Sequence, residues 1–208
     1  STVFRPSEHT RSKIDGRNGN SLSCGFGKER RMPVETRAKR INELWITEEQ
    51  SDHMKLSLRI SDVLLNKKSD YQDILLVETL EYGRTLILDG AIQITEGDEF
   101  CYSEMMAHVA LCSHPDPKKV LIVGGGDGGV LREVLRHKNI EKATLIDIDE
   151  DVINASKKYL PTINVALDDP RADVRNMDAM KFVKEARGEF DVAIVDSTDP
   201  VDFAAGLF

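Results

Sequence analysis

The stretch VLIVGGGDGGVLREV (residues 120–134) decides the fold, because an apolar run leads directly into a glycine-rich turn and then into a helical pattern. Gly124, Gly126 and Gly129 have the G-x-G-x-x-G spacing of nucleotide-binding loops, which permits a tight turn and a close approach of the backbone to a ligand. Asp127 lies inside this loop. A carboxylate here repels a pyrophosphate or a ligand carboxylate, so the loop favours a nucleotide that carries a cation.

The region after Pro117 alternates between strand and helix patterns. We expect strands at 119–124, 142–148, 172–177 and 190–196, and helices at 128–137, 149–159 and 178–187. This alternation predicts an α/β fold, a Rossmann-like parallel sheet with helices on both faces. The last strand pattern is nearly all apolar, which predicts burial on both of its faces.

The region before it has short β patterns separated by turn residues, at 44–47, 54–60, 73–78, 84–88 and 91–95. They predict a small antiparallel β domain. Gly83 and the pair Asp89-Gly90 stand where hairpin turns are needed. We therefore divide the chain into a basic extension (1–40), an N-terminal β domain (41–97) and a Rossmann-like domain (98–208).

A helix that bridges the two domains is expected from Asp98 to a stop at residues 114–117. Cys101, Met105, Val109 and Cys112 share one face of it. This pattern predicts that both cysteines are small buried hydrophobic residues.

Composition limits the class of protein. The chain has 208 residues, a net charge of −8 and three cysteines without metal-ligand spacing, so we predict reduced thiols, no metal and a cytoplasmic protein. No apolar run is long enough to span a membrane, and no secretory signal is recognised. The acidic balance argues against nucleic acid and in favour of a small cationic ligand.

Residues 1–40 differ from the rest, because they contain 10 Lys and Arg against 4 Asp and Glu, whereas residues 41–208 contain 18 against 32. The basic segment lacks helical or strand periodicity and is expected to be disordered. It could be a solvated tail, a weak nucleic-acid binder or a targeting peptide, or Met32 could be the true start of the protein.

Carboxylates gather where the parallel strands are expected to end, and ligands of such sheets bind at these ends. The six residues are Asp127, Asp147, Asp149, Asp178, Asp196 and Asp199. No lysine or arginine matches them in sequence, so the group would repel itself unless a cation binds among them. For Asp149 and Asp178, a helix N-cap is an equally good interpretation.

Asp147 follows Gly124 by 23 residues, a position suited to hydrogen bonding with ribose hydroxyls. NAD and S-adenosyl ligands both have such hydroxyls. Asp127 opposes both the pyrophosphate of NAD and the carboxylate of S-adenosylmethionine. The ligand that suits the loop is an adenosyl sulfonium with an amine and no carboxylate in its tail, namely decarboxylated S-adenosylmethionine.

From Glu43 to Phe208 the chain resembles the spermidine synthase family of aminopropyltransferases. Six segments carry the resemblance: LWITE (44–48), YQ (71–72), LILDG (86–90), DEFCYSEM (98–105), GGGDGG (124–129) and DSTDP (196–200). Together they are highly specific, although each alone is weak.

The resemblance implies aminopropyl transfer from decarboxylated S-adenosylmethionine to putrescine, giving spermidine and methylthioadenosine by in-line displacement at the carbon next to the sulfonium. The donor is a co-substrate, and no cofactor or metal is expected. The attacking amine has a pKa near that of lysine, about 10, so it must first lose a proton, which the neighbouring sulfonium makes easier.

The resemblance also assigns roles to residues. Asp196 is the candidate base. The amine would be held by Tyr102 and Asp199, and the donor's ammonium by Asp127. The nucleoside would be bound by Gln72 and Asp147, with Gly124 and Gly126 beneath it, and the adenine by Asp178 and Ala179. Partners would be these two substrates and further copies of the chain, as a homodimer or homotetramer, without nucleic acid or membrane.

The chain departs from the family pattern at several positions. Asp147 replaces the usual Glu, Ser103 stands where His or Gln is common, and Asp202-Phe203 replace a Gly-Pro pair. The sheet pattern stops after four strands, whereas the family's continues to about seven. We therefore expect a truncated enzyme with poor activity. The alternatives are a non-catalytic fragment that binds adenosyl nucleosides and a small-molecule methyltransferase.

Overall fold

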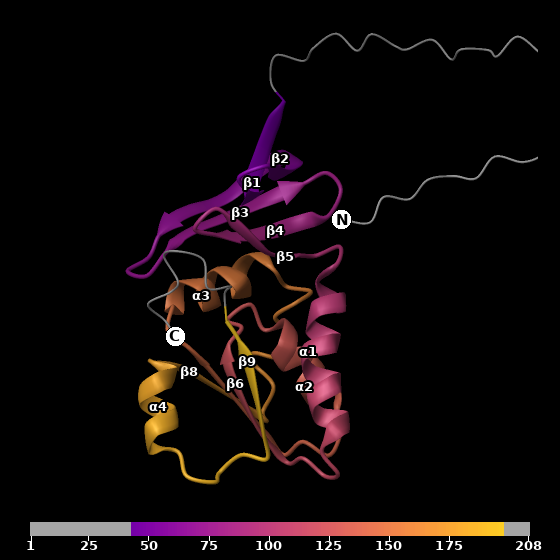
Figure 1. Ribbon diagram of the computed structural model, residues 1–208, viewed down its shortest axis with the longest axis vertical. Coiled ribbons are helices and arrows are strands. Elements are labelled where there is room, and N and C mark those ends of the chain that lie inside the picture. Colours follow the sequence, from indigo (N-terminus) through magenta and orange to yellow (C-terminus); the bar gives the residue numbers. More distant parts are fainter. Residues whose placement is uncertain (1–42, 198–208) are drawn as a thin grey trace, which may run out of the picture. The chain divides into compact units, whose positions relative to one another are not determined.

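The computed structural model describes residues 43–197, which form two sheets and four helices (Figure 1). The first sheet is antiparallel, with its five strands in sequence order: β1 (Leu44–Ser51), β2 (Met54–Lys68), β3 (Asp73–Thr79), β4 (Gly83–Leu88) and β5 (Ala91–Thr95). This is the predicted β meander. At its β4–β5 hairpin, Asp89 (φ 49°) and Gly90 (φ 86°) both adopt the left-handed conformation that a tight hairpin turn requires.

Strand β2 is much longer than the predicted 54–60. Its pairing with β3 shifts between Ile60 and Asp62, and again between Val63 and Leu65. Each irregularity breaks the alternation of inward and outward side chains, so the period-two pattern ends at Ile60 while the strand continues.

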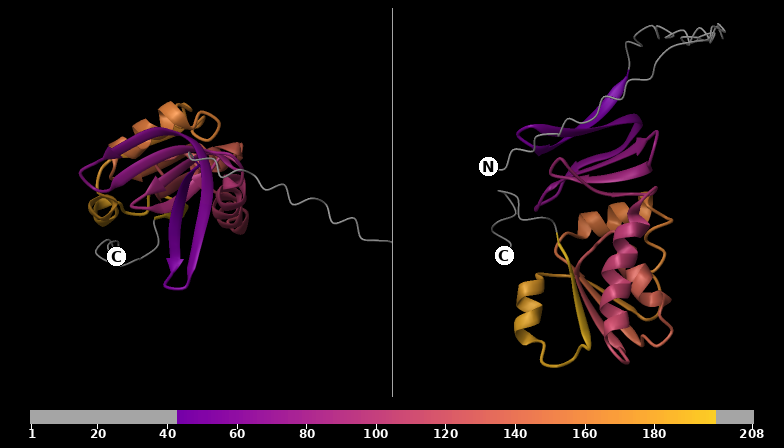
Figure 2. Two further views of the ribbon diagram at one scale, coloured as in Figure 1. Left: turned by 90° about the horizontal axis from the view of Figure 1, so that it is seen from above. Right: turned by 45° about the vertical axis from the view of Figure 1, so that its right-hand side comes forward.

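The second sheet is parallel and alternates with helices. Along the chain its elements are α1 (Glu99–Ser113), β6 (Lys119–Gly124), α2 (Gly129–Arg136), β7 (Lys142–Asp147), α3 (Glu150–Tyr159), β8 (Ala172–Asn176), α4 (Ala179–Glu185) and β9 (Val192–Asp196). The strand order is β8-β7-β6-β9. This confirms the predicted Rossmann-like class, with each element within two residues of its expected limits. α1 and α2 lie on one face of the sheet and α4 on the other (Figure 2).

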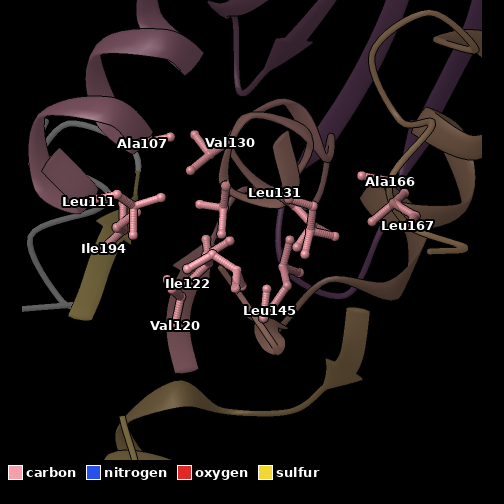
Figure 3. Close-up of a cluster of buried hydrophobic side chains, with 14 of the residues drawn as sticks. Ala107, Leu111, Val120, Ile122, Val130, Leu131, Leu145, Ala166, Leu167 and Ile194 are labelled. Atoms are coloured by element: carbon pink, nitrogen blue, oxygen red, sulfur yellow. The ribbon is translucent and has the colours of Figure 1, made fainter. Parts of the chain in front are cut away.

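The main core fills the space between this sheet and helices α1 and α2. Figure 3 shows side chains from several elements converging there, including Ile122 of β6, Leu145 of β7, Val130 and Leu131 of α2, and Leu111 of α1. All five are almost fully buried. Alternate residues of each strand therefore face α1 and α2, and the residues between them point to the side of the sheet on which α4 lies (Figure 2).

A second core joins the antiparallel sheet to α3. Ile74, Leu76 and Leu86 of that sheet pack with Val152 and Ala155 of the helix. This packing places the start of β3 beside the carboxyl ends of the parallel strands, where the site is found.

Two predictions about burial are wrong. Cys101 and Cys112 are exposed, and Met105 and Val109 between them are 65% and 56% exposed. The buried face of α1 carries Glu99, Ser103, Ala107 and Leu111 instead. Periodicity finds a helix face but not its partner, and here the small Ser103 and Ala107 allow α1 to approach its neighbours closely.

The second error concerns β9, which was expected to be buried on both faces. It is an edge strand among the described residues, and Val195 is 60% exposed while Ile194 is buried. The strand order explains this difference, because β9 pairs only with β6.

Several predictions fall outside the described residues: those on 1–40, Cys24 and Met32, and those on Asp199 and on Asp202-Phe203. The division at 97/98 lies between β5 and α1 and stays a prediction. Within residues 43–197, no helix is both long and apolar enough to cross a membrane.

Candidate active site

The candidate site lies where the order of the parallel strands reverses, between β6 and β9. Gly124, the last residue of β6, pairs with Asp196, the last residue of β9. Gly124 has a φ of +82°, and a Cβ there would stand 1.9 Å from the backbone oxygen of Asp196. Only glycine fits at this position. Because it has no side chain, the loop can contact the backbone of Asp196. A switch point of this kind is the usual ligand crevice of open α/β sheets.

Asp147 braces the glycine loop from the neighbouring strand β7. Its Oδ2 accepts a hydrogen bond of 2.9 Å from the backbone N–H of Gly126, and its Oδ1 accepts one of 2.8 Å from the N–H of Asp149. A Cβ at Gly126 would stand 2.7 Å from Asp147 Oδ2. Each oxygen keeps a second lone pair, so the carboxylate can also accept from ligand hydroxyls.

Asp127 turns back onto its own loop. Its Oδ1 accepts a 2.8 Å hydrogen bond from the N–H of Gly129, the first residue of α2. A Cβ at Gly129 would lie 2.6 Å from Ser103 Oγ and 3.0 Å from Asp127 Oδ1. The loop therefore lies directly against helix α1, and the N–H of Gly129 holds the Asp127 carboxylate.

Helix α1 also supplies Tyr102, whose hydroxyl donates a 2.7 Å hydrogen bond to Asp196 Oδ1. The tyrosine is half exposed. Its hydroxyl therefore connects helix α1 to the carboxylate of Asp196. A cavity of about 370 Å³ borders Tyr102 and Glu99 of α1 and Ile92 and Ile94 of β5.

The pKa values of three carboxyl groups are raised in this cluster. Burial raises the pKa of Asp127 to about 6, with further contributions from the negative charges of Asp196 and Glu99. Burial and the charge of Asp147 raise the pKa of Asp196, although the bond from Tyr102 opposes this. Burial raises the pKa of Asp147 as well, and the charges of Asp149 and Asp127 add to it.

No lysine, arginine or histidine forms an ion pair with Asp127, Asp147 or Asp196 within residues 43–197. Three desolvated carboxyl groups without a counter-charge are unfavourable when ionised. A bound cation would remove this penalty, and the arrangement is therefore suited to a cationic ligand.

Asp149 joins Gln72 to the start of α3. Asp149 is buried, caps α3 through the N–H of Asp151, and accepts hydrogen bonds from Ser69 Oγ (2.6 Å) and Gln72 Nε2 (2.8 Å). The N-cap interpretation of Asp149 is confirmed. Gln72, which precedes β3, is held by this carboxylate at the margin of the site.

Asp178 is also an N-cap. Its Oδ1 accepts from the N–H groups of Met180 and Lys181 at the start of α4, and Lys181 Nζ lies 3.8 Å from Oδ2. The expectation that no lysine matches these carboxylates is wrong here. Asp178 faces its own helix, while Ala179 is the first residue of α4.

A buried network behind the loop was not predicted. Glu99 accepts from Ser103 Oγ (2.9 Å) and from Arg132 Nη2 (2.8 and 3.0 Å to its two oxygens), and Arg132 also pairs with Glu133 at 2.8 Å. It joins α1 to α2 beside Asp127. Glu99 and Arg132 are 33 positions apart, so no spacing rule connects them. The only sequence signal is a charged residue at each helix start.

Comparison with known proteins identifies the family. The spermine/spermidine synthase domain matches residues 99–208, which is more than half of the chain. The chain belongs to the spermine/spermidine synthase family. A second model of the family, the spermidine synthase tetramerisation domain, matches residues 44–96. The resemblance stated from the sequence is thereby confirmed.

Curated relatives and solved structures agree with this assignment. Polyamine aminopropyltransferases of Caldicellulosiruptor saccharolyticus and Thermoanaerobacter sp. are 55% and 53% identical over 166 residues, which are 80% of this chain and 60% of each relative. A crystal structure of spermidine synthase with the transition state analogue AdoDATO matches with a TM-score of 0.75 and 43% identity, over 79% of this chain and 58% of that one. Spermidine synthase from Thermotoga maritima matches with a TM-score of 0.73 and 40% identity, over 80% and 60%. The chain spans about 60% of the length of the relatives it matches.

The structure thus brings most of the family's predicted site residues together. Tyr102, Asp127, Asp147 and Asp196 lie around the Gly124–Gly129 loop. Gln72 reaches this edge through Asp149.

Proposed function

We propose that this chain carries the donor site of an aminopropyltransferase, which moves an aminopropyl group from decarboxylated S-adenosylmethionine to putrescine. The observation that carries the proposal is the group of three carboxyls with raised pKa values around the glycine loop, without a counter-charge among residues 43–197. The donor brings a sulfonium and an ammonium to this place, and the acceptor brings two ammonium groups. The donor is a co-substrate, and the proposal includes no cofactor.

We assign each part of the donor to a binding group along this edge of the sheet. Asp127 binds the tail ammonium, and its charge rejects the carboxylate of ordinary S-adenosylmethionine. Asp147 binds the ribose hydroxyls with its remaining lone pairs, and Gln72 lies at the margin of the same region. We assign the adenine to the start of α4, at Asp178 and Ala179. The backbone of Gly124 and Gly126 forms the floor.

The acceptor reacts at Asp196. An attacking ammonium gives its proton to the Asp196 carboxylate, and the freed lone pair attacks the carbon next to the sulfonium. The carbon–sulfur bond breaks, its electron pair stays on sulfur, and methylthioadenosine leaves. A carboxylate with a raised pKa is a better base than an ordinary one, and the sulfonium lowers the pKa of the ammonium. Tyr102 and Asp199 hold the amine in line.

We propose that the acceptor enters through the cavity of about 370 Å³ beside Tyr102. Its walls combine the apolar Ile92 and Ile94 with the carboxylate of Asp98. This combination suits a flexible alkyl chain with an ammonium at its end, because methylenes contact the isoleucines while the charge stays near carboxylates.

We further propose a homo-oligomer, a dimer or tetramer, assembled through the antiparallel sheet. The match of residues 44–96 to the tetramerisation domain supports it. Leu44, Trp45, Met54 and Leu56 of β1 and β2 are all about half exposed, and such an apolar group is typical of an interface. The exposed thiols Cys101 and Cys112 suit the reducing cytoplasm, where we place the protein.

The test is formation of spermidine and methylthioadenosine from the two substrates, followed by mass spectrometry. Asp196→Asn keeps the size and the bond from Tyr102 but loses the base, and we expect a loss of at least about a hundredfold. Asp168→Asn, which changes an exposed carboxylate outside the site, serves as the matched control. Near-normal rates in Asp196→Asn would contradict the assignment. Binding of methylthioadenosine without turnover would favour the non-catalytic alternative, and methyl transfer from S-adenosylmethionine would favour a methyltransferase.

A further inference from the structure

We propose that the chain has a second binding site, for a small organic anion, on the face of the parallel sheet that α4 covers. A cavity of about 280 Å³ lies there and is lined by three cationic side chains, a threonine, a glutamate and two phenylalanines: Lys119, Lys142, Arg175, Thr144, Glu189, Phe182 and Phe190. We call it the α4-side cavity. Its charge is opposite to that of the carboxylate site.

The two sites lie toward opposite ends of the strands. Lys119 and Lys142 are the first residues of β6 and β7, whereas Asp147 is the last residue of β7. Five steps along a strand correspond to about 16 Å. The α4-side cavity is therefore separate from the proposed donor site and plays no part in its chemistry.

The positive charge in the α4-side cavity is only partly neutralised. Lys142 Nζ and Arg175 Nη2 both lie 2.7 Å from Asp173 Oδ2, and hydrogen bonds from Arg175 and Lys142 hold the pKa of Asp173 at about 2. Lys119 stands beside Lys142 in register, and no ion pair of Lys119 occurs within the described part of the chain. Like charges at adjacent positions of a sheet repel each other. Glu189 lines the wall, and Asp191, whose pKa is lowered partly by the charge of Lys119, lies nearby, so carboxylates offset much of the positive charge. What remains for an anion is the ammonium of Lys119, which no ion pair holds among these residues.

The threonine in the cavity wall is a second, independent indication. Thr144 is only 2% exposed and lines the cavity, and no hydrogen bond of its hydroxyl occurs among residues 43–197. It lies in the middle of β7, on the side that faces α4. Among residues 43–197 the fully buried side-chain atom without a hydrogen-bond partner is Ser156 Oγ, so the Thr144 hydroxyl is not sealed in the core and can bond to what enters the cavity. A ligand oxygen in the cavity would be an acceptor for it, close to the ammonium of Lys119.

The remaining wall is aromatic. The rings of Phe182 and Phe190 have centroids 6.0 Å apart with an interplanar angle of 56°, and the guanidinium of Arg175 lies 5.3 Å from the Phe182 centroid. An apolar ring of a ligand can pack against this pair while its anionic group reaches Lys119 and Thr144. The chemistry that fits is a phosphate or carboxylate attached to a body of about one ring.

The experiment titrates the chain with phenyl phosphate, inorganic phosphate and phenol by calorimetry in an uncharged buffer. We expect phenyl phosphate to bind at least tenfold more tightly than inorganic phosphate, and phenol not to bind. Lys119→Met should weaken the binding of phenyl phosphate at least tenfold, and the isosteric Thr144→Val should weaken it several-fold. Lys158→Met removes an exposed positive charge from α3 and should leave binding unchanged.

Urea unfolding midpoints of the unliganded variants show whether each is folded, so that lost binding is not confused with lost structure. Absence of phenyl phosphate binding to the folded parent chain would overturn the proposal. Equal binding to the parent, Lys119→Met and Thr144→Val would also overturn it, because the anion would then lie elsewhere. Equal affinity for phosphate and phenyl phosphate would contradict the proposed contact between the ligand's ring and the two phenylalanines.

Discussion

Replacing Asp127 with asparagine tests the electrostatic reasoning about the three carboxyl groups around the glycine loop. The pKa of Asp127 is about 6, because burial and the charges of Asp196 and Glu99 disfavour its ionised form, whereas the ordinary value is 3.8. A difference of about 2 units corresponds to about 3 kcal/mol, and since Asp127 and Asp196 share the effect, we expect about 1–3 kcal/mol from Asp127 alone.

The sign follows from the direction of the shift. A carboxyl whose pKa is higher in the folded chain than in the unfolded chain favours folding below about pH 3.8, and this contribution is lost as the pH rises through 6. Ionised Asp127 therefore destabilises the unliganded chain at pH 8. Asp127→Asn should be about 1–3 kcal/mol more stable than the parent at pH 8 and about a third as much at pH 4.5, where the unfolded carboxyl is mostly ionised but the folded one is still protonated. The asparagine oxygen can still accept from the N–H of Gly129.

The assay is urea unfolding at these two pH values, with Asp168→Asn as the control. Asp168 is an exposed carboxylate paired with Lys157, so its replacement should change stability by less than about 0.5 kcal/mol at either pH. An Asp127→Asn variant that is less stable than the parent at pH 8 would refute the reasoning, because ionised Asp127 would then be compensated within the chain.

Three further outcomes are expected. Gly124→Ala should cost about 3 kcal/mol or more in urea unfolding, because its Cβ would stand 1.9 Å from the backbone oxygen of Asp196 at a positive φ. Arg132→Met should cost about 3–5 kcal/mol, since it leaves the buried Glu99 without its cation, and adding Glu99→Gln should restore part of the loss; no restoration would exclude this pairing as the cause. Tyr102→Phe should raise the pKa of Asp196, because the lost hydrogen bond had lowered it, so the acidic limb of the pH–rate profile should move to higher pH; an unchanged limb would contradict a role for Asp196 as the base.

Local signals account for the parts of the structure that the sequence predicted well. The glycine spacing at 124–129 and the Asp89-Gly90 turn require particular backbone conformations, and both are found. The alternation of strands and helices after residue 117 repeats over four strands, so the parallel sheet and the carboxyl-end position of Asp147 and Asp196 follow from it.

The features that the sequence predicted wrongly or did not predict depend on contacts between residues that are distant in the sequence. Periodicity groups Cys101 and Cys112 on one face of α1 and predicts that this face is buried, but it is the exposed face. Periodicity does not say what a helix face contacts. The pairing of Gln72 with Asp149 spans 77 positions, and that of Glu99 with Arg132 spans 33. Such pairs are set by the packing of one sheet against α3 and of α1 against α2, which a single sequence does not reveal.

The central claim is that Asp127 selects a cationic donor without a carboxylate. Calorimetric titration with decarboxylated S-adenosylmethionine and with S-adenosylmethionine tests it most directly. We predict at least about tenfold tighter binding of the decarboxylated ligand, equal to about 1.4 kcal/mol, and a smaller difference in Asp127→Asn, because the repelling charge is gone. Equal affinity for the two ligands, or a preference for S-adenosylmethionine in the parent chain, would contradict the claim.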